Sequence, residues 1–129
     1  MTTPKKVLVV DDDQLMRMML GMMLTRAGYE VMSAEDGRSA LEKVATEKPD
    51  LVLTDGLMPD MHGLTVCKAI KRLAAPPKVV LLTASTSEMK RAEAYAPDDI
   101  LIKPVRSAEL IACIERLLSD ALQFTECGS

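Results

Sequence analysis

Short apolar runs recur along the chain, and each of them gives way to polar residues. Four of these runs cover residues 7–10, 51–53, 79–82 and 100–102. None of them alternates apolar with polar positions, which is typical of strands buried on both faces of a parallel sheet. Between the runs, apolar residues recur at a spacing of three or four, as they do in helices that pack one face on a core.

This pattern predicts five strands that alternate with five helices. The strands are expected over about residues 5–10, 29–33, 50–54, 78–83 and 100–102, and the helices over about 14–27, 37–48, 64–73, 87–96 and 107–123. Such alternation favours right-handed crossovers and a parallel sheet with helices on both faces. The predicted fold is therefore α/β, doubly wound and flavodoxin-like, with five strands in the order 2-1-3-4-5.

Residues suited to helix ends support these boundaries. Asp13 and Ser107 are expected to cap the first and last helices through their side-chain oxygens, and Gly28 and Pro49 are expected to end helices. Apolar stripes then predict the buried faces of two helices: Met16, Met19, Leu20, Met23, Leu24 and Ala27 on the first, and Val66, Cys67, Ile70 and Leu73 on the third.

Composition indicates one ordinary globular domain. The 129 residues, 48% of them hydrophobic and 27% charged, suit a single domain over 1–129 with an ordered core over about 5–123. The tail after it is short and polar, so no output domain is expected. A net charge of −3 without a basic run argues against direct binding of nucleic acid, and no run is long enough for membrane insertion or a signal peptide.

The cysteines point to a reducing compartment. Cys67, Cys113 and Cys127 are odd in number, widely spaced and free of any C-x-x-C motif. They are therefore interpreted as buried or free thiols in the cytoplasm, and not as metal ligands.

Candidate chemistry follows the ends of the predicted strands. The first strand ends at residues 11–13, which are all Asp, and the third carries Asp55; Thr83 and Lys103 end the fourth and fifth. A single Asp in such a place is more often a loop or capping residue. In the order 2-1-3-4-5, however, the first and third strands are neighbours at the switch point of the sheet, so the acidic ends should meet there.

Together these positions resemble a response-regulator receiver domain of two-component phosphorelay signalling, of the chemotaxis-regulator kind. Each motif alone is common, but the whole set in this order is specific, and it spans nearly the full chain. The set consists of the acidic pair Asp11-Asp12, Asp55, Met58-Pro59 with Gly63, Thr83-Ala84, and Lys103-Pro104.

The resemblance implies a role for each site residue. Asp55 corresponds to the phosphoacceptor, and Asp11 and Asp12 to the metal-binding pair, with Asp55 and the main-chain carbonyl of Leu57 as further ligands. Oxygen ligands of this kind suit Mg²⁺, with Mn²⁺ as a substitute. Lys103 would neutralise a phosphoryl oxygen and Thr83 would donate its hydroxyl to the acyl phosphate.

The resemblance also implies partners and a class of protein. The phosphoryl group would come from a sensor histidine kinase or a histidine phosphotransfer protein, and the switched surface would act on a downstream protein target. Such a bacterial phosphoprotein is a cytoplasmic signalling switch, not an enzyme on other substrates: it catalyses only its own phosphorylation and dephosphorylation.

Four features depart from the family pattern. The position two after the phosphoacceptor, often polar, is Leu57, and an aromatic position on the fifth strand is Ile100. The turn over residues 95–99 is shortened and lacks the usual Ala-Gly sequence, and His62 stands where an Asp is common. We interpret His62 as an exposed loop residue. The usual aromatic coupling to the switch is therefore open to question.

One face of the first helix admits two interpretations. Leu15, Met18 and Met22 lie on an arc where a solvated helix should be polar. Either the helix is deeply packed with adaptable methionines, or the stripe is an exposed docking surface for a helical kinase or phosphotransfer partner.

Three other classes compete with the receiver interpretation. A pseudo-receiver, a protein-interaction module without phosphorylation control, is favoured by the altered turn and Ile100 but not by the intact acidic, Thr83 and Lys103 positions. A hydrolase with an aspartyl nucleophile would need a cap domain and further motifs. A flavin-binding relative would need a phosphate-binding loop where this chain has acids, which repel phosphate.

Overall fold

The strands form one parallel sheet. The computed structural model describes residues 4–56, 63–84 and 96–119, together with Ser87, Lys90 and Glu93. Its five strands lie in the order β2-β1-β3-β4-β5, which confirms the predicted topology. Their bounds are β1 (Lys6–Val10), β2 (Glu30–Ala34), β3 (Leu51–Asp55), β4 (Lys78–Thr83) and β5 (Asp99–Ile102).

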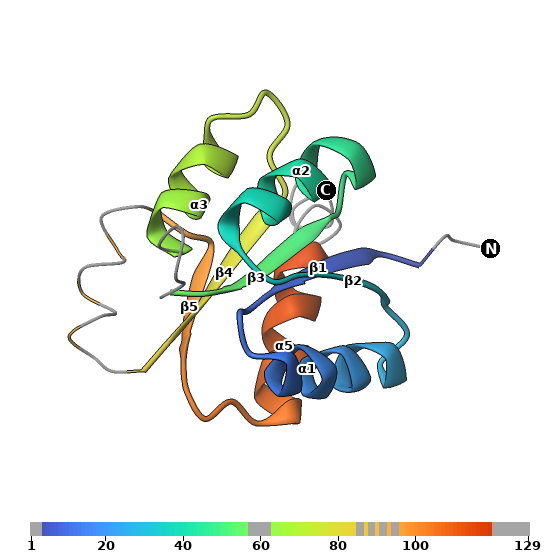
Figure 1. The fold of residues 1–129 in the computed structure, drawn as a ribbon. Coiled ribbons are helices and arrows are strands. Elements are labelled where there is room, and N and C mark those ends of the chain that lie inside the picture. The colour runs from blue at the N-terminus through green and yellow to red at the C-terminus, as the bar shows by residue number, and fades with distance from the viewer. Residues whose placement is uncertain are drawn as a thin grey trace, which may run out of the picture.

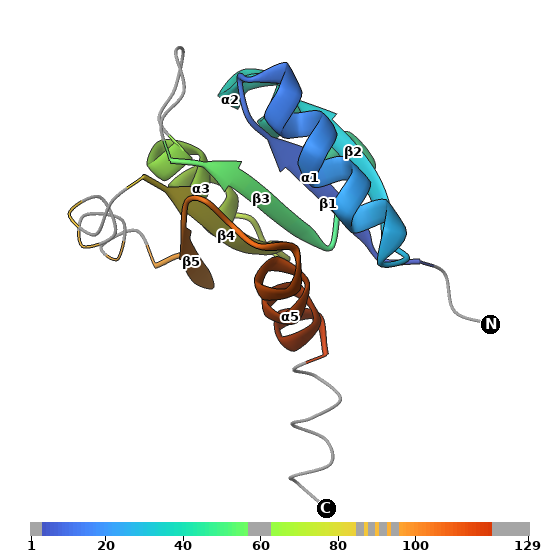
Figure 2. The same ribbon diagram turned by 90° about the horizontal axis from the view of Figure 1, so that it is seen from below.

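Helices cover both faces of the sheet. Figures 1 and 2 show α1 and α5 on one face and α2 and α3 on the other. The bounds are α1 (Gln14–Arg26), α2 (Gly37–Glu47), α3 (Gly63–Lys71) and α5 (Ser107–Leu118). The helix predicted over residues 87–96 lies mostly outside the described residues, although Ser87, Lys90 and Glu93 are helical. Residues 120–123, also predicted as helical, lie outside them as well.

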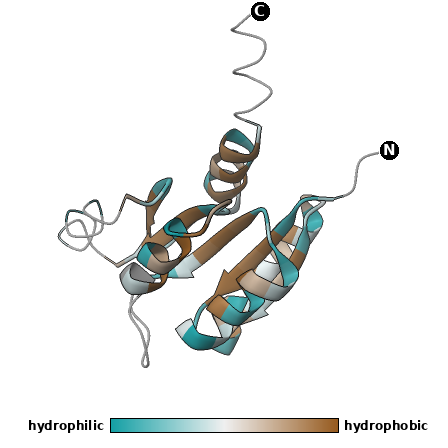
Figure 3. Ribbon diagram, turned by 90° about the horizontal axis from the view of Figure 1, so that it is seen from above, coloured by the Kyte–Doolittle hydropathy of each residue, from teal (hydrophilic) through white to brown (hydrophobic). Residues whose placement is uncertain are grey.

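The sheet separates two hydrophobic cores. Successive residues of a strand point to opposite faces, so Val7 and Val9 pack with α1 and α5, whereas Leu8 and Val10 pack with α2 and α3. Figure 3 shows the central strands as hydrophobic along most of their length. Burial on both faces is what their unbroken apolar sequence predicts.

Of the two predicted helix caps, one is confirmed and the other is wrong. Asp13 caps α1, because its Oδ1 accepts a hydrogen bond of 2.9 Å from the backbone N–H of Leu15. The predicted cap at Ser107 is wrong. Arg106 is the last residue with extended dihedrals (φ −83°, ψ 146°) and makes no side-chain cap, so Ser107 already lies inside the first turn of α5.

Two predicted buried faces are also narrower than expected. On α3 the buried stripe is Val66, Cys67 and Ile70, but the helix ends at Lys71, so Leu73 lies beyond it and is 46% exposed. On α1, Leu20 and Leu24 are buried and Met16 and Met23 pack half-buried against the same core, whereas Met19 and Ala27 are exposed.

Two consecutive carboxylates attach β5, the strand that precedes Lys103, to the neighbouring strand and to helices on both faces of the sheet. Asp98 accepts hydrogen bonds from Lys71 Nζ on α3 (2.8 Å) and from the backbone N–H of Val79 on β4 (2.7 Å). Asp99 forms an ion pair with Arg116 on α5. In the part of the unusual turn that the structure describes, these contacts fix the start of β5.

The thiols behave as core residues. Cys67 and Cys113 are both buried, and neither belongs to a disulfide in the part of the chain described here. Burial raises the pKa of Cys67 to about 11 and that of Cys113 to about 12. Cys127 lies outside the described residues. Among the described helices, none has the length and apolar character needed to cross a membrane.

Candidate functional site

The predicted acidic side chains meet at the carboxyl edge of the sheet. Asp55 ends β3, and Asp11 directly follows β1, whose Val10 is paired with Thr54 of β3. Adjacent parallel strands thus place the two carboxylates next to each other. Together with the exposed Asp12 they form a cluster in which one oxygen from each residue lies within 4.8 Å of the others.

Asp11 is the buried member of this cluster, with 1% of its surface exposed. Its Oδ1 accepts a 2.9 Å hydrogen bond from the backbone N–H of Asp13, but its buried Oδ2 has no hydrogen-bond partner among the described residues. Desolvation by burial raises the pKa of Asp11, and the neighbouring charge of Asp55 adds to the rise. A buried carboxylate oxygen without a donor is a group that a cation would satisfy.

The backbone of residues 11–13, called the acidic loop below, is anchored on two sides. The N–H of Asp11 donates to the carbonyl of Ala34 at the end of β2 (3.2 Å). Its carbonyl accepts a 2.6 Å hydrogen bond from Nη1 of Arg17 on α1. No motif in the sequence singles out Arg17. Its position on the helix that follows the acidic loop, six residues after Asp11, is the only signal of this contact.

Lys103 contributes a positively charged side chain to the site. Its Nζ lies 3.2 Å from Oδ1 of Asp55, and the two side chains are 30% and 13% exposed. The backbone N–H of Lys103 donates to the carbonyl of Thr83 (2.7 Å). This hydrogen bond, between the residue after β5 and the last residue of β4, fixes the position of the lysine backbone at this edge of the sheet.

Thr83 lies at the same edge, but Leu57 is not described. Thr83 is the last residue of β4 and is 1% exposed, and its predecessor Leu82 is paired with Asp55. The structure therefore brings Asp11, Asp12, Asp55 and Lys103 together and places Thr83 on the adjacent strand. The predicted motifs at Leu57, Met58-Pro59 and His62 lie outside the described residues.

The donors present fit a hard divalent cation. All three clustered groups are carboxylates, and Mg²⁺ and Mn²⁺ prefer oxygen ligands. The partnerless Oδ2 of Asp11 lies in this cluster. Three carboxylates at this separation repel one another unless a cation balances them, and the positive charges of Lys103 and Arg17 in the described part of the chain still leave a net negative charge.

The stripe on α1 is exposed, so the interpretation of a deeply packed helix is wrong. Leu15, Met18 and Met22 are 63%, 56% and 55% exposed. Met19 and Ala27, which the apolar spacing assigns to the core, are exposed as well, and Met19 is 45% exposed. The helix is therefore not packed on all sides, and it carries a patch of large apolar side chains facing solvent.

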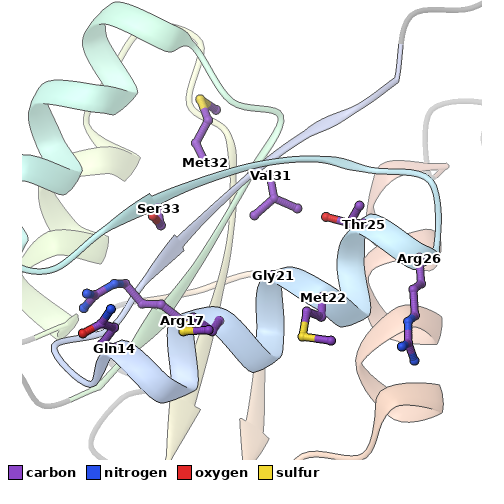
Figure 4. Close-up of a pocket in the computed structure, with 10 residues that line it drawn as sticks. Gln14, Arg17, Gly21, Met22, Thr25, Arg26, Val31, Met32 and Ser33 are labelled. Carbon is purple, nitrogen blue, oxygen red and sulfur yellow. The ribbon is translucent and has the colours of Figure 1, made fainter.

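Hollows lie on both sides of α1. A groove of about 620 Å³ runs along α1 and the edge strand β2 and is lined by Met18, Met22 and Val31, among others (Figure 4). A second hollow of about 340 Å³ lies between α1 and the segment after β5, with Met19, Pro104 and Val105 in its wall. Met19 borders this second hollow instead of filling a core position.

A comparison with protein families and known proteins gives a consistent result. Residues 7–115 match the model of the response regulator receiver domain. The chemotaxis protein CheY of Thermotoga maritima is 35% identical over 116 residues, which cover 88% of this chain and 97% of that protein. The alkaline phosphatase synthesis transcriptional regulatory protein PhoP of Bacillus subtilis is 36% identical over 116 residues, covering 88% of this chain but 48% of PhoP.

Solved structures agree with the sequence relatives. The chemotaxis response regulator CheY4 of Vibrio cholerae has a TM-score of 0.81 and 35% identity, with 88% of this chain and 98% of that chain covered. A CheY-like receiver domain protein of Methanospirillum hungatei has a TM-score of 0.86 and 27% identity, covering 94% and 98%. The chain spans about half the length of PhoP and of ResD of Bacillus subtilis, and nearly all of CheY. On this evidence, the chain belongs to the response-regulator receiver domain family.

Proposed function

We propose that this receiver domain accepts a phosphoryl group on Asp55 from a phosphohistidine, in a reaction that depends on Mg²⁺ held by Asp11, Asp12 and Asp55. As a member of its family the chain is a signalling switch of the phosphoryl-transfer kind. The observation that carries the proposal is the convergence of three carboxylates within 4.8 Å, one of them 3.2 Å from Lys103. We further propose that it works in the cytoplasm.

The reaction follows from the position of Asp55. A carboxylate oxygen of Asp55 attacks the phosphorus, an O–P bond forms, and the P–N bond of the donor phosphohistidine breaks with its electron pair going to the imidazole nitrogen. Phosphoryl transfer needs little covalent help from a protein beyond positioning and charge stabilisation. When bound, Mg²⁺ would supply that stabilisation by balancing the carboxylates and the phosphoryl oxygens; Leu57 would add its carbonyl as a ligand.

Lys103 and Thr83 are proposed to stabilise the product. The ammonium of Lys103 already lies 3.2 Å from Asp55 Oδ1, within reach of a phosphoryl group on the same carboxylate. Thr83 ends the strand beside β3 and precedes the loop that would respond to the phosphate. A hydroxyl donated to the acyl phosphate would draw that loop inward and switch the surface seen by a downstream protein target.

The test of this proposal is the intact mass of the protein after incubation with a small phosphodonor such as acetyl phosphate. The expected result is a gain of one phosphoryl group in the presence of Mg²⁺ or Mn²⁺ and none in excess EDTA. No gain with any divalent cation would contradict the proposal. It would favour the alternative of a phosphorylation-independent pseudo-receiver that works through protein–protein contacts.

The exposed stripe of α1 is proposed as the docking surface for the donor, a sensor histidine kinase or phosphotransfer protein. Leu15, Met18 and Met22 present a continuous apolar patch on the helix that follows the acidic loop. Leu15 donates its backbone N–H to Asp13, at the end of α1 that adjoins the acidic loop, so a helical partner seated on the stripe would lie near the carboxylate cluster.

Negative charge placed on this stripe should slow phosphoryl transfer from a donor protein without slowing uptake from a small phosphodonor. We expect the double variant Met18→Glu, Met22→Glu to slow transfer from a phosphorylated donor protein by about tenfold or more, since a buried apolar contact is replaced by two carboxylates. Uptake from acetyl phosphate should stay at the parent rate. Transfer rates from both donors, measured by mass, make the comparison.

The matched control is Ala45→Glu, which adds a carboxylate at an exposed position of α2. It lies on the opposite face of the sheet and should leave both rates unchanged (Figure 1). Equal slowing with both donors in the double variant would show that the stripe is not a docking surface.

A further inference from the structure

We infer that Arg17 is a positioning residue for the metal site: it holds the main-chain carbonyl of Asp11 and so aims the carboxylates of the acidic loop at the cation. This inference rests on the proposed metal site and adds to it a residue that is not itself a ligand. Its basis is the 2.6 Å hydrogen bond from Arg17 Nη1 to the Asp11 carbonyl.

The acidic loop has few other restraints. The N–H of Asp11 is held by β2, and the N–H of Asp13 is held by the Asp11 side chain itself. Asp12, the central residue, is exposed, and none of the described residues forms a hydrogen bond or ion pair with it. The hydrogen bond from Arg17 fixes the orientation of the peptide that joins Asp11 to Asp12, because the accepting carbonyl belongs to that peptide. Rotation of this peptide would turn both carboxylates at once.

Arg17 is itself held in place by the helix. Its backbone N–H donates to the carbonyl of Asp13 (3.0 Å), which begins the hydrogen-bonded ladder of α1, and Asp13 caps the same turn. The acidic loop, the cap and the arginine therefore form one closed unit of seven residues, 11–17. A planar guanidinium loses less freedom on binding than a flexible ammonium does, so it is well suited to hold a backbone carbonyl in one orientation.

The surroundings of Arg17 allow it to be changed without harm to the core. Its side chain is half-buried and borders the groove between α1 and β2, with Gln14 beside it and Arg26 at the other end (Figure 4). Neither hydrophobic core includes it. A shorter or apolar side chain would leave space open to solvent instead of a cavity.

Electrostatics alone predicts the opposite effect. Arg17 is a cation close to a proposed cation site, so removing its charge should by itself make metal binding tighter. If Arg17 acts by positioning, its removal should make metal binding weaker. The direction of the change therefore separates the two accounts.

The test is titration of the metal-free protein with Mn²⁺, followed by electron paramagnetic resonance, with Mg²⁺ as competitor. Arg17→Met is expected to weaken binding of both ions by roughly 10–100-fold, as is usual when a residue that orients metal ligands is lost. Arg17→Lys, which keeps a donor, should fall between the parent and Arg17→Met. Arg26→Met removes an equal charge from the same helix and groove and should bind metal like the parent.

Urea unfolding in EDTA supplies the readout that distinguishes positioning from a structural role. A purely structural Arg17 would lower the free energy of unfolding and leave metal affinity unchanged. Arg17→Met with the parent affinity, or with a tighter one, would overturn the inference while leaving the proposed function intact. If the parent itself bound neither ion, the proposed function and the inference would fail together.

Discussion

Asp55→Asn is expected to take up no phosphoryl group from acetyl phosphate in Mg²⁺, whereas the parent protein becomes phosphorylated. An amide oxygen is a far weaker nucleophile than a carboxylate, and the variant also removes the charge that pairs with Lys103 at 3.2 Å. Because Asp55 is at the end of β3 and partly accessible, the isosteric change should leave the sheet intact. Intact mass and far-ultraviolet circular dichroism measure the two effects.

Asp13→Asn is the matched control for this loss. Asp13 is an exposed carboxylate of the same acidic loop, but it caps α1 instead of joining the cluster, and Asn caps helices as well as Asp does. Phosphorylation of this variant should proceed as in the parent. Phosphoryl uptake by Asp55→Asn at the parent rate would place the acceptor elsewhere and contradict the proposed role.

Asp11→Asn should have two large effects of opposite sign. Metal affinity should fall by more than about 100-fold, since changes to residues outside the ligand set already cost roughly 10–100-fold. The metal-free protein should become more stable, by about 1–3 kcal/mol, because a buried charge with one partnerless oxygen beside Asp55 and Asp12 disappears. Metal titration and urea unfolding in EDTA measure the two effects on the same protein.

The stability difference should depend on pH in a fixed direction. Burial raises the pKa of Asp11 above the ordinary 3.8, so the folded protein holds this proton more firmly than the unfolded chain does. The charged Asp11 side chain therefore destabilises the parent protein fully at a pH above the pKa of Asp11 in the folded state, and this destabilisation disappears as the pH falls below 3.8. The difference in the free energy of unfolding between Asp11→Asn and the parent should therefore become smaller as the pH is lowered. An advantage that widened toward acid, or a variant less stable than the parent at neutral pH, would contradict this account of Asp11.

The sequence predicts the sheet, and the meeting of Asp11 and Asp55 at its edge, for a physical reason. Strands buried on both faces must be apolar throughout, so their ends are visible where polar residues begin. The position of Asp11 and Asp55 then follows from strand order alone, because adjacent parallel strands end at the same edge.

The remaining features depend on contacts that no periodicity encodes. Whether Ser107 caps α5 depends on which residue is the last with extended dihedrals, and that residue is Arg106. Met19 has the spacing of a core residue, but a hollow lies beside it. The reach of Arg17 to a backbone carbonyl depends on one rotamer of a long side chain. Such features belong to tertiary structure and are missed when a sequence is analysed by pattern.

The role of Asp55 is tested by locating the phosphoryl group within the chain. After incubation with acetyl phosphate and Mg²⁺, borohydride reduces an acyl phosphate and converts the aspartate that carries it into homoserine. Tandem mass spectrometry of the digested protein then identifies the position. We expect homoserine at residue 55 alone, and none when Mg²⁺ is replaced by EDTA. Homoserine at Asp11, Asp12 or another acidic residue in place of Asp55 would contradict this expectation.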